Sequence, residues 1–122
     1  MANIWITATR WLTVPLLLHA APLAARDASP WPGHYYLQGV METGSELLLQ
    51  ADGRFQWYLV YGALDLFAQG RWTQEGDRII LIAKPSGDIP RPGFDRLELT
   101  PRDGALIPPD GRGAYEKAQA HD

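Results

Sequence analysis

SELLLQADGRFQWYLVY, residues Ser45–Tyr61, contains the two strands and the turn that decide the fold. Apolar and aromatic residues dominate both sides of a central Asp-Gly pair, which predicts a β-hairpin. The loop is either Asp52-Gly53 alone or Ala51-Asp52-Gly53, a type I turn that ends in a bulge. In the longer loop Gly53 takes the left-handed conformation, which glycine adopts without steric cost.

The two loop lengths place different residues opposite each other. A two-residue loop pairs Leu49 with Gln56 and mixes apolar with polar side chains. A three-residue loop instead pairs Leu49 with Phe55 and Leu47 with Trp57. Because a slip of one residue moves every side chain to the other face of the sheet, only the second register gives an apolar face. We therefore expect the three-residue loop.

A second hairpin is expected from Leu64–Thr73 and Arg78–Ile82, which flank a turn signal with a central Glu-Gly pair. A two-residue turn and a four-residue loop give the same register, in which Trp72 lies opposite Ile79. Gly70 falls on the same face as Trp72, where its missing side chain leaves space that a neighbouring aromatic ring would fill.

The remaining segments complete an all-β chain. His34–Glu42 is expected to be a strand, 83–93 a loop, Phe94–Thr100 a strand with clean alternation, and Ala105–Ile107 a short last strand. We expect a single antiparallel up-and-down meander of six to seven strands, forming a curled sheet or small barrel. Residues 34–109 would form this β-meander domain.

The two ends of the chain are expected to lie outside the domain. Residues 1–25 resemble a signal peptide, with an apolar core and a small-residue end, followed by a lead-in over 26–33. A membrane anchor needs about 20 apolar residues, and Pro15 and Pro22 interrupt the run. We therefore expect cleavage, a periplasmic or secreted protein without stable membrane insertion, and a flexible tail over 110–122.

Composition narrows the function classes. The chain has no cysteine, so neither disulfides nor thiolate metal sites are expected, and we predict no metal and no cofactor. The net charge is −3, and it becomes −4 when the expected leader is removed with Arg10, which argues against nucleic acid or anionic membrane surfaces as partners.

Four short segments resemble small exported lipocalin-like β-meander domains: Gly33-His34-Tyr35, Leu47–Phe55, Gly70-Arg71-Trp72 and Gly76–Ile79. Such domains include the N-terminal domain of copper-resistance lipoproteins and uncharacterised proteobacterial exported proteins. The resemblance implies a curled sheet or barrel. It does not imply copper handling, because the chain lacks a lipidated cysteine and a cysteine-based metal motif.

Catalytic side chains are few. Of three histidines, only His34 lies in the expected domain, since His19 belongs to the leader and His121 to the tail. No serine sits in a recognisable nucleophile turn. We predict no catalytic residues and no enzyme activity.

Aromatic residues give the functional hint. One interpretation makes Trp57 and Trp72 core residues. The other places a ligand site on the concave face, formed by Tyr35, Trp57, Tyr61, Arg71 and Trp72.

Two functions follow from these interpretations. The first is an exported non-enzymatic domain that docks to an envelope protein partner or serves as a structural module, using an outer apolar strip of Leu48, Ile80 and Ile82. The alternative is a lipocalin-like carrier or sensor of a small apolar ligand. A hollow of a few hundred Å³ favours the carrier, whereas a filled interior with an apolar strip outside favours docking.

Overall fold

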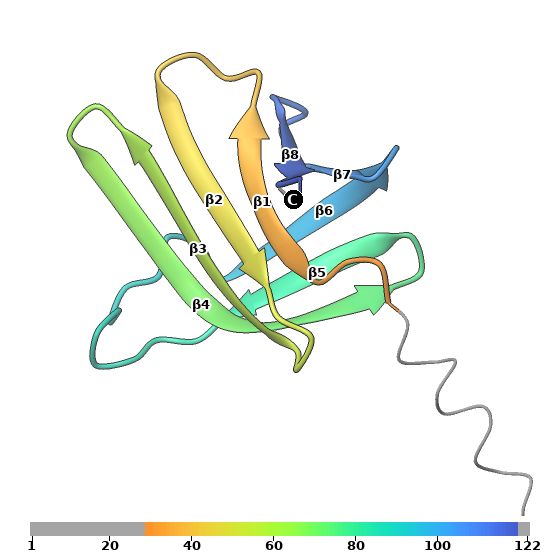
Figure 1. The fold of residues 1–122 in the computed structure, drawn as a ribbon. Coiled ribbons are helices and arrows are strands. Elements are labelled where there is room, and N and C mark those ends of the chain that lie inside the picture. The colour runs from red at the N-terminus through yellow and green to blue at the C-terminus, as the bar shows by residue number, and fades with distance from the viewer. Residues whose placement is uncertain (1–28, 120–122) are drawn as a thin grey trace, which may run out of the picture. The chain divides into compact units, whose positions relative to one another are not determined.

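The structure, a computed structural model, describes residues 29–119, so the expected signal peptide lies outside the described residues. Eight antiparallel strands pair with their neighbours in chain order, and β1 also pairs with β8, which closes the sheet into a barrel (Figure 1). The expected all-β meander is confirmed in its barrel form. The strands are β1 (Gly33–Gln38), β2 (Thr43–Leu49), β3 (Arg54–Tyr61), β4 (Leu64–Glu75), β5 (Arg78–Ala83), β6 (Arg96–Arg102), β7 (Ala105–Ile107) and β8 (Ala114–Lys117).

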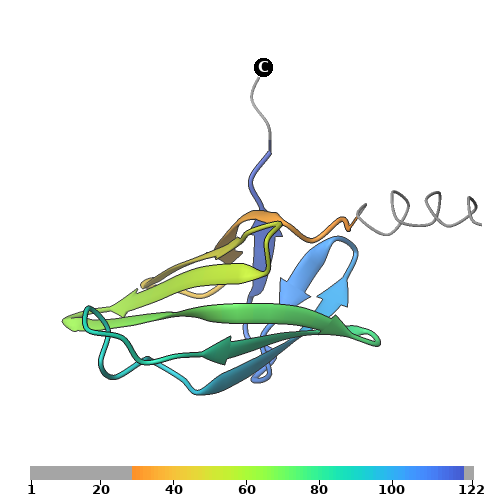
Figure 2. The ribbon, with the colours of Figure 1, turned by 90° about the horizontal axis from the view of Figure 1, so that it is seen from below.

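The eighth strand corrects the expected count of six to seven, because the supposed tail over 110–122 contains β8. Tyr115 of β8 lies opposite both Leu37 of β1 and Leu106 of β7, and only 3% of its surface is exposed. Figure 2 shows the two ends of the sheet brought side by side by its curl. β8 was hard to predict because a four-residue strand with one large apolar side chain shows no clear alternation in its sequence. The strands that it pairs with, β1 and β7, come beside it only through the tertiary fold.

β1 is shorter than expected. It ends at Gln38 and not at Glu42, because Gly39 and Glu42 adopt positive φ angles of 86° and 58° in the turn that follows. Tyr35 points into the barrel and is fully buried, whereas Tyr36 lies on the outer face.

The central hairpin has the expected register. Leu47 pairs with Trp57 and Leu49 with Phe55, around a loop in which Gly53 has a φ of 93°. The Gly53 amide donates to the carbonyl of Gln50 at 3.0 Å. The apolar face predicted from alternation is therefore the inner face of the barrel.

Gly53→Val is expected to destabilise the fold by about 1 to 3 kcal/mol, because valine strongly disfavours the left-handed conformation. Gly87→Val is the matched control, since an added Cβ meets nothing within 4 Å at either position and only Gly53 has a positive φ. The measurement is the free energy of unfolding by chemical denaturation. Equal losses at the two sites would show that backbone conformation at Gly53 is not the cause.

The second hairpin differs from the expected register by two residues. Trp72 pairs with Leu81 and not with Ile79, and the tight turn is Gly76-Asp77. Gly76, with a φ of 61°, occupies the first turn position, where a type II′ turn favours glycine. A shift of two residues preserves the faces, so Trp72 still points inward.

Gly70 has a different role from the one expected. A Cβ at this position would clash with the carbonyl oxygen of Ile82. The missing side chain thus admits the backbone of β5, and does not leave space for an aromatic ring.

The loop over 84–95 completes the barrel wall beside the first half of β4, because β5 pairs only with the second half. The amides of Lys84 and Gly93 donate to the carbonyls of Gln69 and Phe67, at 2.9 and 2.7 Å. The partly buried Phe94 then packs against the core, with its ring centroid 5.9 Å from that of Phe55 and 4.9 Å from that of Trp57.

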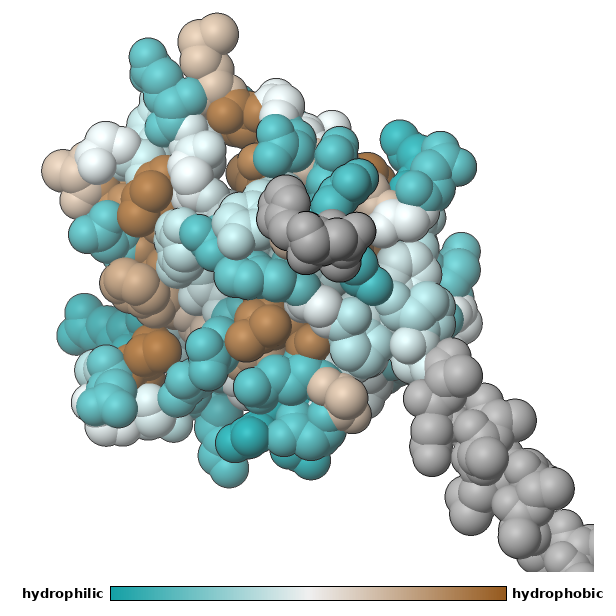
Figure 3. All heavy atoms as spheres, in the orientation of Figure 1, coloured by the Kyte–Doolittle hydropathy of each residue, from teal (hydrophilic) through white to brown (hydrophobic). Residues whose placement is uncertain are grey.

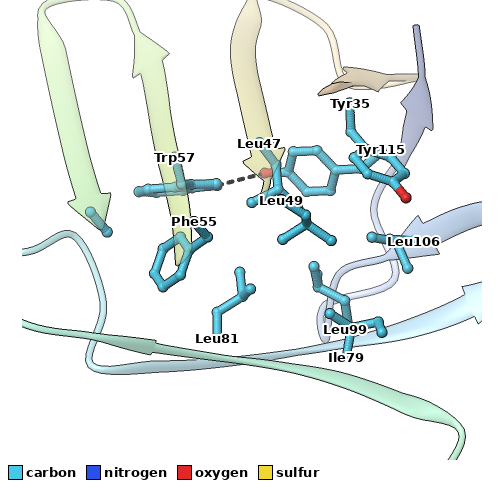
Figure 4. Packing of buried hydrophobic residues seen from close by; sticks show 11 residues of the cluster. Tyr35, Leu47, Leu49, Phe55, Trp57, Ile79, Leu81, Leu99, Leu106 and Tyr115 are labelled. Carbon is cyan, nitrogen blue, oxygen red and sulfur yellow. Dashed lines mark hydrogen bonds between the residues drawn. The ribbon is translucent and has the colours of Figure 1, made fainter. Parts of the chain in front are cut away.

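The barrel interior is filled by its own side chains (Figure 4). Most of the large residues that point inward are fully or almost fully buried, as expected for a well-packed core. They come from all strands of the barrel: Tyr35, Leu47, Leu49, Phe55, Trp57, Ala68, Ile79, Leu81, Leu99, Leu106 and Tyr115.

Candidate functional site

The five residues predicted to bind a ligand do not form one site. Tyr35 is a core residue, fully buried, whose hydroxyl donates to the carbonyl of Trp31 at 2.7 Å. The amine of Lys117 lies 5.7 Å from the centre of its ring. Burial raises the pKa of Tyr35 to about 12, so the phenol is neutral at physiological pH.

Trp57 is also a core residue, with 8% of its surface exposed. Its indole Nε1 donates to the Tyr115 hydroxyl at 3.0 Å, the dashed line in Figure 4. The Tyr115 hydroxyl lies 2.8 Å from Ser45 Oγ, which itself donates to the carbonyl of Tyr58 at 2.6 Å. Because serine has one hydroxyl hydrogen, Tyr115 must donate to Ser45.

These bonds form a continuous chain from Trp57 through Tyr115 and Ser45 to the backbone of β3. Each buried polar group has a partner, which removes the cost of leaving it unpaired. Burial raises the pKa of Tyr115, so its hydroxyl stays protonated and can continue to donate. The chain ties β2, β3 and β8 together, and its role is structural.

Trp72 and Arg71 lie toward the β2–β3 turn. The half-buried Trp72 donates from Nε1 to the carbonyl of Gln50 at 2.8 Å, and its amide donates to Gly53 at 2.9 Å. Trp72 thus holds the turn against β4. Arg71 lies on the outer face, directly opposite Arg54, so it cannot share a concave site with Trp72.

Tyr61 lines an open apolar hollow at the opposite end of the barrel, whereas Trp57 and Arg71 each line a different hollow. The β1–β2 turn, the β3–β4 turn and the segment before β8 gather at this end, at the top of Figure 1. We call this hollow the mouth; its volume is about 370 Å³. It is lined by Leu37, Val40, Thr43, Leu59, Tyr61, Leu64, Pro108, Asp110, Arg112 and Tyr115.

The mouth exposes large apolar side chains to solvent. Tyr61 and Leu64 form the last pair before the β3–β4 turn and are 56% and 50% exposed. Deeper in the mouth, Leu37 and Leu59 pack against the core. Asp110 and Arg112 are the charged residues in its lining. Such apolar walls with few polar groups suit a small, largely apolar ligand.

A polar cluster lies on the outer face. His34 Nε2 is 2.7 Å from Glu46 Oε1, and the Tyr58 hydroxyl donates to the other Glu46 oxygen. The Tyr58 hydrogen bond, with a smaller contribution from His34, holds the Glu46 pKa below its usual value. Over residues 29–119, no serine, threonine or cysteine side chain lies in hydrogen-bond contact with His34.

Sequence reasoning missed most of the mouth. Leu64 and Leu59 were expected only as strand residues, and Pro108, Asp110 and Arg112 belong to a segment expected to end the domain or follow it. One sequence feature could have indicated β8. Pro109-Asp110-Gly111 is typical of a turn, and a turn at this place suggests that another strand follows it.

The fold and the site define an antiparallel up-and-down barrel with a filled interior and an apolar mouth. The comparisons find no matching family model, no similar curated protein and no similar solved structure. The resemblance to lipocalin-like meander domains therefore stays a prediction from the sequence pattern. Over residues 29–119, no helix has the length and hydropathy that crossing a membrane requires.

Proposed function

We propose that the protein is a non-enzymatic binding barrel that holds a small apolar or ring-bearing ligand in its mouth. The observation that carries the proposal is the hollow of about 370 Å³ in which Tyr61 and Leu64 are exposed above Leu59. Placing an apolar ligand there removes both exposed side chains from water, which is favourable by about 25 cal/mol per Å² of apolar surface. Export to the periplasm or beyond is proposed from the sequence of residues 1–25.

Docking through the predicted outer apolar strip has less support. Ile80 is only 3% exposed, and Leu48 and Ile82 lie on β2 and β5, with two strands between them. On the face shown in Figure 3, apolar residues form separate patches among hydrophilic ones. The strip is therefore not a continuous surface for a partner.

The mouth can be tested with N-phenyl-1-naphthylamine, a neutral aromatic probe that fluoresces in apolar surroundings. Wild-type protein is expected to bind it, and Leu64→Ser is expected to weaken binding about tenfold because an apolar wall is lost. The measurement is a fluorescence titration of the two proteins.

Ile82→Ser is the matched control. Ile82 is an aliphatic strand residue with 45% exposure that does not line the mouth, and this substitution should leave the affinity unchanged. Wild-type protein that does not bind the probe, or equal losses in the two variants, would contradict a ligand site in the mouth.

A further inference from the structure

Two further hollows lie side by side on the outer face of β2, β3 and β4. Their volumes are about 330 and 390 Å³, and both are lined by Gln56 and Gln69, which are direct cross-strand partners. The loop over 84–95 contributes Ile89 to the first hollow and Ser86 to the second. The two hollows therefore adjoin each other at Gln56 and Gln69, and we call them together the outer furrow.

One end of the outer furrow is cationic. Arg54 and Arg71 lie directly opposite each other on β3 and β4, and Lys84 lines the same hollow. Like charges directly opposite each other in a ladder are destabilising. Asp52 binds Arg54 at 2.9 Å from outside, and the described residues that line this hollow include no carboxylate. This end therefore has an excess of positive charge directed at one small space.

A second group of arginines, Arg78, Arg96 and Arg102, lines another hollow, and the lining of that hollow includes a carboxylate, Glu98. Arg78 and Arg96 lie on neighbouring strands, and Glu98 binds both, at 3.1 and 2.9 Å. In the outer furrow Asp52 bonds to Arg54 and also interacts with the charge of Arg71, but it does not line the hollow, and Lys84 adds a third cation there. An anion from solution would complete the cationic end in the way that Glu98 completes the other cluster.

The other end of the outer furrow is apolar and aromatic. Leu48, Phe67 and Ile89 line it, and Phe67 is 50% exposed. His34, Glu46 and Tyr58 close this end, and Glu46 is ionised at neutral pH, since its pKa lies below a usual value that is itself acidic. That carboxylate repels an anion at the apolar end, so it orients a ligand with its charge toward the arginines.

We propose that the outer furrow binds an anionic amphiphile. The carboxylate or phosphate head lies between Arg54, Arg71 and Lys84, and the alkyl or aryl tail lies over Gln56 and Gln69 toward Phe67. Hollows of a few hundred Å³ suit a single small molecule. This site is separate from the mouth and does not depend on the proposed function.

The test is a titration of the full chain, followed by amide chemical shifts in NMR spectra, with four probes below their micelle concentrations. Decanoate and decyl phosphate carry the two head groups, 1-decanol carries the tail alone, and inorganic phosphate carries a head alone. Decanoate or decyl phosphate should shift the amides around Gln56 and Gln69, and binding should weaken as ionic strength rises. The neutral and the tail-less probes should bind at least about tenfold more weakly, because each lacks one set of contacts.

Arg71→Gln should weaken binding of the anionic probes about tenfold through loss of a charge-assisted hydrogen bond. Arg96→Gln is the control with the same change in net charge, and it should leave their affinity within a factor of about two, because exposed pairs away from the site contribute little. Removing one of two opposed arginines should not lower the melting temperature, so weaker binding is not a result of unfolding.

Several results would overturn the proposal. If 1-decanol binds as tightly as decanoate, the cationic end does not contribute to binding. If inorganic phosphate binds as tightly as decyl phosphate, the tail does not contribute. Shifts confined to Tyr61 and Leu64 would move the amphiphile to the mouth. Equal losses of affinity in Arg71→Gln and Arg96→Gln would show that the effect comes from net charge and not from a site at Arg71.

Discussion

A chain that ends at Pro109 is expected to lose its cooperative unfolding transition. The truncation removes β8, whose backbone pairs with Tyr35 to Gln38 of β1, and leaves both β1 and β7 with unpaired edges. It also removes Tyr115, which fills the core between Leu37 and Leu106 and accepts the hydrogen bond of Trp57. Loss of a buried aromatic side chain alone costs about 3 to 5 kcal/mol.

The measurement is chemical denaturation followed by far-ultraviolet circular dichroism. A chain that ends at Ala118 is the control, because it keeps β8 and the bond from the Ala118 amide to the His34 carbonyl. The control should unfold at the wild-type midpoint. If the chain ending at Pro109 also does so, residues 110–122 are a dispensable tail and the barrel does not need β8 to fold.

Trp57→Ala is expected to lower the free energy of unfolding by about 3 to 5 kcal/mol. The substitution leaves a cavity beside Phe94 and Leu47 and deprives the Tyr115 hydroxyl of its donor. Because small domains have about 5 to 15 kcal/mol in total, the variant should be partly unfolded or poorly expressed.

Trp72→Ala is the comparison, measured in the same denaturation series. Its side chain is only half-buried and its indole bonds to one carbonyl at the β2–β3 turn, so the loss should be smaller than for Trp57. Wild-type stability in Trp57→Ala would contradict its place in the core and would favour a ligand-accessible role.

Strand alternation was sufficient to predict which side chains point inward. Leu47, Leu49, Phe55 and Trp57 share the inner face because only one register places all four there. The predicted register of the second hairpin was wrong for a different reason. Pairing Trp72 with Ile79 or with Leu81 puts the same side chains on the inner face, so alternation does not distinguish the two registers. Turn geometry at Gly76 decides between the two registers, and face alternation carries no information about it.

The candidate site was harder to predict because alternation does not say where a residue lies along the barrel. Tyr61 and Trp72 both point inward, yet they lie at opposite ends, and Arg71 points outward beside Trp72. Position along the axis depends on the shear of the closed sheet, which only the complete set of strand pairings defines. The mouth further depends on Arg112 and Tyr115, whose place is defined by the closure of β8 onto β1.

The pairing of Tyr35 with Lys117 also bears on how the chain reaches its native state. The hairpins from β1 to β5 join residues close in sequence, whereas the seam between β1 and β8 joins opposite ends of the described chain and carries the largest loop-closure entropy. Contacts of such high sequence separation slow folding. The barrel cannot close until Lys117 has been synthesised, so the growing chain presents an open, partly apolar sheet until then.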